Sequence, residues 1–559
     1  MKKRTVFMSA FAALALFTPA ALFANGGAQS SASKQVTLTA PGTLPVTRDS
    51  GAALDVFMVQ YADQSGDLLT NTALNEFQKA VNVKLNLTIA EEGSARERLN
   101  LLLNSGQYPE VIVFNSVSAT DLIRYGTTEK IFIPLNTLID EQGTNIKAYF
   151  AKYPWVKESI TSPDGNIYGI PAVNSGAKQA NHGMIGYKLW YNTAWLQKLG
   201  LSKPTTTEEF RTMLRAFKTR DPNGNGKADE IPLTGAYGTW AADPYLFLLN
   251  AFGYFDESLR MLRNDTFTPT ANQDYIRDGL AYIKSLFDEG LLDPASLTQT
   301  LQQMTAVGNN PGDNIMGAAT CGHLGMAIDI ANVERAKVYT TLEPLRGPNG
   351  YRGIPANSDE VRPTSGMFMI TDKCKNPALA LRFADAYCTA DWAIRGQVGM
   401  KGKQWTDADP GSFGPDGKTP AKIKYLTVVN ATTATSNDML GWAFRLLEED
   451  WKSQIQLVGD ITNPVNYEGR LLQETVKLLP YAADVQTIPP LAYSETASAR
   501  RSQINTALSD YVKNSFAEFI TGKRNLTSGW DAYKQELERL GYSEYVKIDQ
   551  DAYNAYRRK

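Results

Sequence analysis

Hydrophobic residues recur with two different periods along the chain. Residues 54–59 are apolar except for Asp55, and 83–89 are apolar at every second position, which predicts two strands. Residues 70–80 and 95–103 repeat apolar side chains at helical spacing, and 110–114 is a short run typical of a strand buried on both faces. The order strand, helix, strand, helix, strand predicts a parallel or mixed sheet in an α/β lobe.

The same two patterns continue through the rest of the chain, with no internal repeat. A hairpin arm is expected at 165–171, and further strands and helices are expected at 188–191, 193–200, 207–219, 273–289, 367–370, 377–389, 507–521 and 530–540. These elements have no single clean linker between them, which indicates lobes built from discontinuous segments.

The N-terminus has the pattern of a secretory signal. Three basic residues at 2–4 precede an apolar stretch at 6–23, and small residues follow. We expect cleavage after Ala24, with Ala28 as the alternative; a retained membrane anchor is the competing interpretation, which Pro19 and the short apolar span disfavour. Residues 25–50, rich in Gly, Ala, Ser and Thr, are expected to form a flexible leader.

Three cysteines constrain the location and the covalent structure. None of Cys321, Cys374 and Cys388 follows the signal, so no residue there can carry a lipid, and a periplasmic protein is expected. Their odd number leaves at least one thiol unpaired. A bond between Cys374 and Cys388 is an alternative, but a helix predicted between them favours three buried, unpaired thiols.

Composition excludes some functions. In 559 residues, 56 basic residues nearly balance 58 acidic ones, so nothing draws the chain to nucleic acid or to anionic membranes. Histidine, the commonest general base, occurs only at His182 and His323. This scarcity disfavours catalysis centred on histidine.

A set of short motifs resembles the extracytoplasmic solute-binding proteins of carbohydrate importers of the ATP-binding cassette (ABC) type, and most closely the large branch that includes the alginate-oligosaccharide-binding proteins. Besides the signal, the matching segments are LNSGQYPEVI at 103–112, DGNIYGIP at 164–171, WLQKLGL at 195–201, PTT at 204–206, the loop at 221–232, FDEGLL at 287–292, FITG at 519–522 and WDAY at 530–533. Each segment alone is weak, but their order and spacing together are specific and span most of the mature chain.

The resemblance implies a two-lobed periplasmic binding protein fold of type II, an α/β fold whose discontinuous lobes are joined by hinge strands, with the ligand in the cleft between them. We assign 51–169 and 365–440 to the first lobe, and 170–364 and 441–559 to the second. The expected partners are an oligosaccharide and the permease subunits of the importer in the inner membrane, and the protein is expected to be a monomer.

Residues 221–232, DPNGNGKADEIP, have calcium-loop spacing. Oxygen-bearing side chains stand at positions 1, 3, 5 and 9, and Gly226 at position 6 allows the sharp turn. Position 12 is Pro232 instead of glutamate, and no standard second helix is expected after it. By resemblance, the ligands of a structural Ca²⁺ are Asp221, Asn223, Asn225, the Lys227 carbonyl, Asp229 and Glu230. A surface turn made of Asx residues is the alternative.

Sugars bind by stacking on aromatic rings and by hydrogen bonds to planar polar groups, so loop residues of these types are the cleft candidates. The candidates are Trp240 and Tyr237 in a Gly-rich loop, Asn115 and Ser116 at the end of a predicted strand, Asn174 after the crossing at 170–171, Trp405 in a second loop, and Arg395, which could meet an acidic sugar. The near-neutral charge leaves the charge of the ligand open.

Three functions compete. The main hypothesis is a binding protein, not an enzyme, that delivers an oligosaccharide to an ABC importer. The second is a secreted, calcium-containing polysaccharide-degrading enzyme, a hydrolase or a lyase, since such enzymes also have aromatic clefts. The third is a binding protein for another solute, such as a peptide, or one that serves a chemoreceptor.

Overall fold

A computed structural model describes residues 36–60, 66–91, 94–114, 117–173, 185–356, 364–428, 436–440, 445–447, 451–486, 488–489, 491 and 493–558. The predicted signal lies outside these residues. The flexible leader predicted at 25–50 is wrong for 36–50. This segment folds back on itself through Thr39 and Val46, and Val46 is fully buried. The buried Arg382 guanidinium donates to the Thr39 and Ala40 carbonyls at 2.8 and 2.9 Å, which fastens the segment to the first lobe.

The first lobe is built on a six-stranded mixed sheet of order β13-β4-β10-β3-β1-β2. Its strands are β1 (Ala53–Gln60), β2 (Lys84–Glu91), β3 (Val111–Val113), β4 (Ile170–Val173), β10 (Thr364–Ile370) and β13 (Arg445–Leu446). β1 runs parallel to β2 and β3, and β10 runs antiparallel to β3 and β4. The mixed sheet predicted from hydrophobic periodicity is confirmed.

Both faces of this sheet are covered. Along β1, Val56 and Met58 belong to a cluster with α1 (Thr72–Val81) and α13 (Pro377–Tyr387), while Phe57 packs on the opposite face with α2 (Ala95–Ser105). The alternation follows from the two-residue repeat of a strand. The helices α3 (Ala119–Leu122), α4 (Asn136–Gln142), α5 (Asn145–Lys152), α6 (Pro154–Ile160) and α14 (Ala390–Val398) complete the lobe.

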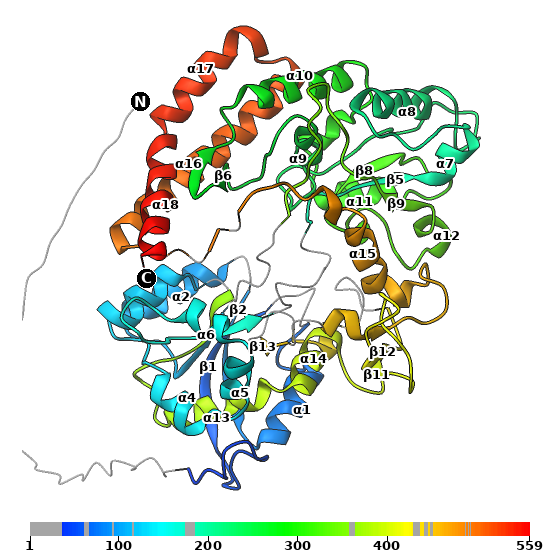
Figure 1. Ribbon diagram of the computed structural model, residues 1–559. Helices are drawn as coiled ribbons and strands as arrows, with labels where there is room; N and C mark the ends of the chain where they lie inside the picture. Colours follow the sequence, from blue (N-terminus) through cyan, green and yellow to red (C-terminus); the bar gives the residue numbers. More distant parts are fainter. Residues whose placement is uncertain are drawn as a thin grey trace, which may run out of the picture. The chain divides into compact units, whose positions relative to one another are not determined.

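The sheet corrects the predicted lobe boundaries. We placed 170 and 441 at the start of second-lobe segments, but β4 pairs with β10 and β13 pairs with β4, so both strands belong to the first lobe. In Figure 1, the blue-to-cyan part of the chain and the yellow-green α13 and α14 gather in this lobe, although the green segment separates them in sequence. The lobes are therefore discontinuous, as expected.

The second lobe contains a three-stranded sheet of order β8-β5-β9 and most of the long helices. The strands are β5 (Leu189–Asn192), β8 (Ala318–Thr320) and β9 (Tyr339–Thr341), and a separate hairpin is formed by β6 (Arg260–Arg263) and β7 (Thr266–Pro269). The helices are α7 (Thr193–Lys198), α8 (Thr207–Thr219), α9 (Pro244–Leu248), α10 (Asp274–Asp288), α11 (Leu301–Gly308), α12 (Val333–Ala336), α15 (Tyr467–Val476), α16 (Glu495–Thr521), α17 (Leu526–Arg539) and α18 (Tyr542–Arg557). The helix predicted at 507–521 thus begins twelve residues earlier, at Glu495.

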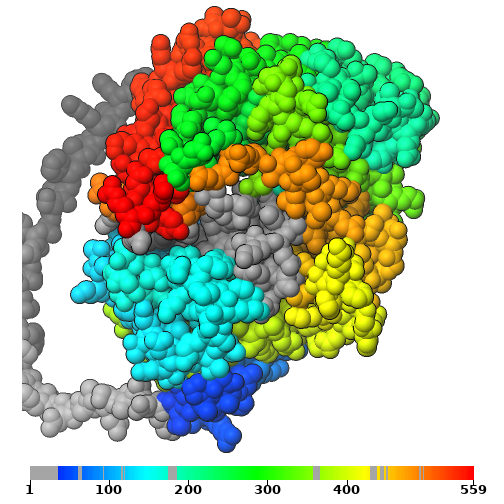
Figure 2. Space-filling view, in the orientation of Figure 1, coloured from blue at the N-terminus to red at the C-terminus, as the bar shows by residue number. Residues whose placement is uncertain are grey.

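A smaller sheet, β11-β12-β14, comprises β11 (Trp405–Asp407), β12 (Ile423–Tyr425) and β14 (Ile455–Gln456). From it the chain continues into α15, where the Glu474 carboxylate accepts hydrogen bonds from Thr340 and Thr341 of the second lobe. Figure 2 shows this orange segment lying along the green residues of the second lobe.

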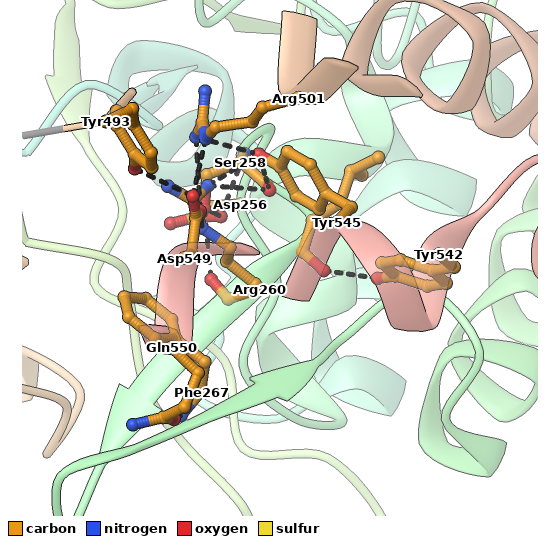
Figure 3. Close-up of polar contacts among 11 residues, drawn as sticks. Asp256, Ser258, Arg260, Phe267, Tyr493, Arg501, Tyr542, Tyr545, Asp549 and Gln550 are labelled. Atoms are coloured by element: carbon orange, nitrogen blue, oxygen red, sulfur yellow. Dashed lines mark hydrogen bonds and ion pairs between the residues drawn. The ribbon is translucent and has the colours of Figure 1, made fainter. Parts of the chain in front are cut away.

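A buried ion network fastens the C-terminal helices to the β6–β7 hairpin (Figure 3). Asp549 of α18 is fully buried and pairs with Arg260 of β6 and with Arg501 of α16, the latter at 2.5 Å. Tyr493 donates its hydroxyl to the same carboxylate at 2.7 Å. One carboxylate therefore joins three separate segments.

The three cysteines are unpaired, as predicted. Cys321 and Cys388 are buried, whereas Cys374 is only half-buried. Burial raises the pKa of the Cys374 thiol to about 12, so it stays protonated at neutral pH.

Candidate functional site

The calcium-loop motif follows α8 and coils around its own first residue. α8 begins with a capping box, in which Thr206 and Glu209 satisfy each other's backbone N–H groups. After the helix, the Asp221 carboxylate accepts the backbone N–H groups of Gly224, Asn225 and Gly226 at 2.8, 3.1 and 3.0 Å. A single side chain thus sets the curvature of the loop.

The other oxygen-bearing side chains of the motif turn toward the same place. The amide groups of Asn223 and Asn225 both donate to the Asp229 carboxylate, at 3.1 Å each for the shortest contacts. Their carbonyl oxygens accept the backbone N–H groups two residues further along, as in Asx turns. The structure therefore brings these predicted ligands together.

Glu230 is the group that the loop's own hydrogen bonds leave unsatisfied. Its Oε1 atom is buried and has no hydrogen-bond partner among the described residues. Burial, and to a smaller extent the negative charges of Asp221 and Asp229, raises the pKa of Glu230. A buried acceptor without a donor beside two further carboxylates is an arrangement that a cation would stabilise.

Among the described residues, no three His, Cys, Asp or Glu side chains form a group spaced to hold a metal ion. Asp221, Asp229 and Glu230 are three such side chains, so the carboxylates of the expected ligand set are not spaced as a metal site in this structure. The other three expected ligands, two asparagine amides and the Lys227 carbonyl, are outside those four residue types. After the loop, Ile231 donates its N–H to the Ile315 carbonyl at 2.8 Å, and Gly317 donates to the Ile231 carbonyl at 2.9 Å. The chain therefore leaves the loop as extended backbone, without a second helix, as expected.

Trp240 lies at the tip of the next loop. The loop is closed at its base by a hydrogen bond from Ala236 N–H to the Ala242 carbonyl, and Thr320 of β8 donates its hydroxyl to the same carbonyl at 2.9 Å. The Trp240 side chain is 49% exposed, and its indole N–H makes no hydrogen bond to a described residue. A large ring is therefore half exposed at the tip of this loop, with a donor that no described residue uses.

Asp243 fixes the turn of this loop from beneath. The residue is 1% exposed, and both of its carboxylate oxygens accept the Gly238 N–H at 3.2 Å. Burial raises the pKa of Asp243 to about 7, against the opposing effects of the Gly238 hydrogen bond and the Lys513 charge. Nothing in the sequence singled out Asp243, because its importance depends on burial.

Of the next four residues predicted to line the cleft, the structure describes only Tyr237. Tyr237 donates its hydroxyl to Asn514 of α16 at 3.0 Å, and the Lys513 ammonium lies 4.4 Å from the centre of its ring, so the ring is already partly covered. Asn115, Ser116 and Asn174 lie outside the described residues.

Two of the predictions do not agree with the structure. Trp405 is not a loop residue with an open ring: it begins β11, is 3% exposed and donates its indole N–H to the Gly399 carbonyl at 2.8 Å. It belongs to the core of the small sheet. The Arg395 guanidinium is held by Asp391 at 3.0 Å and by Glu76 at 3.6 Å, so it already has counter-charges within the first lobe.

The two-lobed fold is that of a solute-binding protein. The family described as bacterial extracellular solute-binding protein matches residues 62–394, and the chain belongs to this family. Family and neighbours are binding proteins, which excludes the secreted enzyme as the main function. The chain is therefore a solute-binding protein, and its relative FusA is named as the substrate-binding protein of an ABC transporter.

Its relatives include the fructooligosaccharide ABC transporter substrate-binding protein FusA of Streptococcus pneumoniae serotype 4, which is 28% identical over 497 residues, 86% of each chain. A solved structure of the S. pneumoniae FusA EF-hand mutant in complex with fructo-nystose has a TM-score of 0.77 at 24% identity and covers 90% of this chain and 99% of that one. The alginate-binding protein AlgQ2, solved without calcium ion, has a TM-score of 0.67 at 22% identity and covers 90% and 98%. Among the described helices, none has the length and apolar character needed to cross a membrane.

Proposed function

We propose that the chain captures an oligosaccharide outside the cytoplasm and that Trp240 is the aromatic platform on which one sugar ring stacks. The proposal rests on the half-exposed indole, whose N–H makes no hydrogen bond to a described residue. A sugar offers a C–H face that can stack on the ring and a hydroxyl that can accept from the N–H. The relative FusA, which aligns over most of the chain, is named for fructooligosaccharides. This supports a saccharide over a peptide ligand.

The test is calorimetric titration of the mature protein with neutral and acidic oligosaccharides, including fructooligosaccharides and alginate oligosaccharides, with product analysis of the same mixtures. For the ligand that binds, Trp240→Ala should weaken affinity by about tenfold or more, since a stacked ring at the centre of a site contributes more than about 1 kcal/mol. Phe413→Ala is the matched control because Phe413 is equally exposed, at 51%, outside this loop. Unchanged affinity in Trp240→Ala would refute the platform, and cleavage of the oligosaccharide would refute a binding-only role.

We further propose that residues 221–232 hold a structural Ca²⁺. Asp221, Asn223, Asn225, the Lys227 carbonyl, Asp229 and Glu230 would supply the oxygens, and the ion would neutralise the crowded carboxylates. The Glu230 oxygen that lacks a partner among the described residues supports this. Two similar proteins support it as well, because FusA was solved as an EF-hand mutant and AlgQ2 was solved without calcium ion. The ion would stabilise the loop and take no part in ligand binding.

This proposal is tested by comparing the stability of the wild type and Glu230→Gln in calcium and in chelator, where their order should reverse. With calcium about a hundredfold above its Kd, the wild type should gain about 2.7 kcal/mol over the chelator-treated protein. Glu230→Gln should lose most of that gain, yet in chelator it should be at least as stable as the wild type, because it removes one of the crowded negative charges. Asp416→Ala, in a surface turn where Asp416 accepts the Lys418 and Thr419 N–H groups, is the control that should keep the calcium response. Equal melting temperatures in calcium and in chelator for the wild type would exclude the ion.

Delivery by closure of the two lobes onto the ligand, followed by docking on the permease, is the corresponding mechanism. Small-angle scattering should show a smaller radius of gyration with a confirmed ligand, at a mass of one chain. An unchanged radius of gyration at saturating ligand would contradict closure.

We also propose a periplasmic location after removal of residues 1–24, which N-terminal sequencing of the exported protein would establish.

A further inference from the structure

Two glycines lie directly against the Trp240 indole. A Cβ atom added to Gly322 would lie 2.2 Å from Cζ3 and 2.5 Å from Cη2 of the ring, and one added to Gly186 would lie 3.3 Å from Cζ2. Carbon atoms without a bond between them prefer a separation of about 3.5–4.0 Å. The ring therefore occupies the volume that any side chain at Gly322 would need.

Backbone conformation does not account for these glycines. Neither Gly186 nor Gly322 is among the residues with positive φ, so an alanine could adopt the local backbone at both positions. Both residues are buried. The six-membered ring of Trp240 takes the space that a Cβ atom at Gly322 would need, whereas a Cβ atom at Gly186 would require the ring to shift by only a few tenths of an ångström.

The two glycines lie just outside neighbouring strands of one sheet, Gly186 before β5 and Gly322 after β8. Leu189 of β5 faces Thr320 of β8, and the pairing continues with a hydrogen bond from Cys321 N–H to the Lys188 carbonyl at 3.1 Å. Gly186 and Gly322 therefore extend the same end of the β5–β8 pair. The base of the Trp240 loop is bonded to β8 as well, because Thr320 N–H donates to the Thr234 carbonyl at 3.1 Å.

The β5–β8 pair thus holds the base of the Trp240 loop and the two glycines in one rigid element. The loop therefore cannot move away as a unit to make room for a methyl group. A Cβ at Gly322 would have to be accommodated by the indole itself, which would retreat by about 1 Å or turn about its side-chain bonds. Such a turn would change both the exposed part of the ring and the direction of its N–H.

We propose that Gly186 and Gly322 are positioning residues for saccharide binding, because their bare backbone seats the Trp240 indole in the orientation that stacks on the sugar. This inference rests on the proposed function of Trp240. The two glycines act through the ring without touching the ligand themselves. Alanine should have a larger effect at Gly322 than at Gly186, because the added Cβ at Gly322 overlaps the ring far more than the one at Gly186.

The experiment uses the mature protein labelled with 5-fluorotryptophan, together with calorimetric titration of the oligosaccharide found in the panel. The Trp240 fluorine line, assigned by its loss in Trp240→Phe, should shift strongly in Gly322→Ala and less in Gly186→Ala. Affinity should fall about tenfold in Gly322→Ala and by a smaller factor in Gly186→Ala. Gly126→Ala is the matched control: its Cβ would lie 2.6 Å from the Tyr168 ring in the first lobe, an equal kind of clash away from Trp240.

A double mutant shows whether the effect passes through the ring. Gly322→Ala combined with Trp240→Ala should bind no more weakly than Trp240→Ala alone. If the effects of the two substitutions on affinity were fully additive, or if the Trp240 fluorine line did not move, the positioning role of the glycines would be overturned. The stacking role of Trp240 would remain intact. A shifted line with wild-type affinity in both Gly322→Ala and Trp240→Ala would instead overturn the stacking role and, with it, the role of the glycines in binding. Gly186→Ala keeps the test decisive if Gly322→Ala does not fold.

Discussion

Replacing Asp243 by asparagine should make the protein less sensitive to alkaline pH. Burial raises the pKa of Asp243 from 3.8 to about 7, with the Glu257 charge adding to the effect and Gly238 and Lys513 opposing it. The folded state therefore binds a proton more tightly than the unfolded chain. Stability from this group falls as the pH rises from about 4 to about 7, and stays low above that range.

The size of the effect follows from the pKa change. A change from 3.8 to about 7 corresponds to a cost of about 4 kcal/mol for the fully ionised carboxylate. Nearly all of this cost is present at pH 8 and less than half at pH 5, so about 2–3 kcal/mol separates the two conditions. Asp243→Asn removes the ionisation. Any cost of burying the asparagine amide is the same at both pH values, so it cancels in the comparison.

The assay is thermal unfolding of the wild type and Asp243→Asn at pH 5 and pH 8. The melting temperature of the variant relative to the wild type should rise by roughly 2–3 °C between the two pH values. Asp409→Asn is the control: hydrogen bonds from Lys424 and Gln456 lower the pKa of this exposed carboxyl, so it is ionised at both pH values. Parallel pH curves for Asp243→Asn and the wild type would refute the reasoning.

Three further predictions concern other parts of the molecule. Asp549→Ala leaves the buried Arg260 without its counter-charge, so the free energy of unfolding should fall by about 3–5 kcal/mol, and Arg260→Leu in the same chain should restore part of it in denaturant titrations. Trp405→Phe removes the hydrogen bond to Gly399 and should cost about 1–3 kcal/mol of stability while leaving calorimetric sugar affinity unchanged; weaker binding would return Trp405 to the site. Chelation of the ion proposed at 221–232 should lower the melting temperature without changing the affinity measured at 20 °C.

The two tryptophans, 240 and 405, show how far sequence reasoning reaches. Both stand beside glycines in segments that lack helical or strand periodicity, so both were predicted to line the cleft. Trp405 is instead buried by residues distant in sequence, such as Tyr425 and Trp451 of the same cluster. Whether a ring is covered depends on tertiary partners, which local composition does not specify.

The fold of the first lobe was easier to predict because its strands and helices have strong periodic patterns. β1, α1, β2, α2 and β3 lie where hydrophobic spacing placed them. The lobe boundaries were wrong at β4 and β13 because four- and two-residue strands join a sheet only through pairing with β10 and β4. Pairing partners far apart in sequence leave no local signal.

The two parts of the site differ in the same way. The calcium-loop motif is encoded within twelve consecutive residues, and the structure brings Asn223, Asn225 and Asp229 of this motif together. The Trp240 ring lies against Gly186 and Gly322, which approach it because β5 and β8 pair, while Asp243 holds the turn of the loop at Gly238. Each of these residues is ordinary in sequence, and only its neighbours in space give it a role.

The segment between the metal loop and the Trp240 loop explains why the two should act independently. Thr234 donates its N–H to the Ala318 carbonyl at 3.0 Å and accepts the Thr320 N–H at 3.1 Å. Its hydroxyl also donates to Asp293 at 2.9 Å. These bonds fasten the chain to β8 before the Trp240 loop begins, so loosening residues 221–230 need not reach the ring. Because β8 holds this segment between the two loops, we expect an ion bound at 221–232 to stabilise the lobe without changing the position of the Trp240 ring.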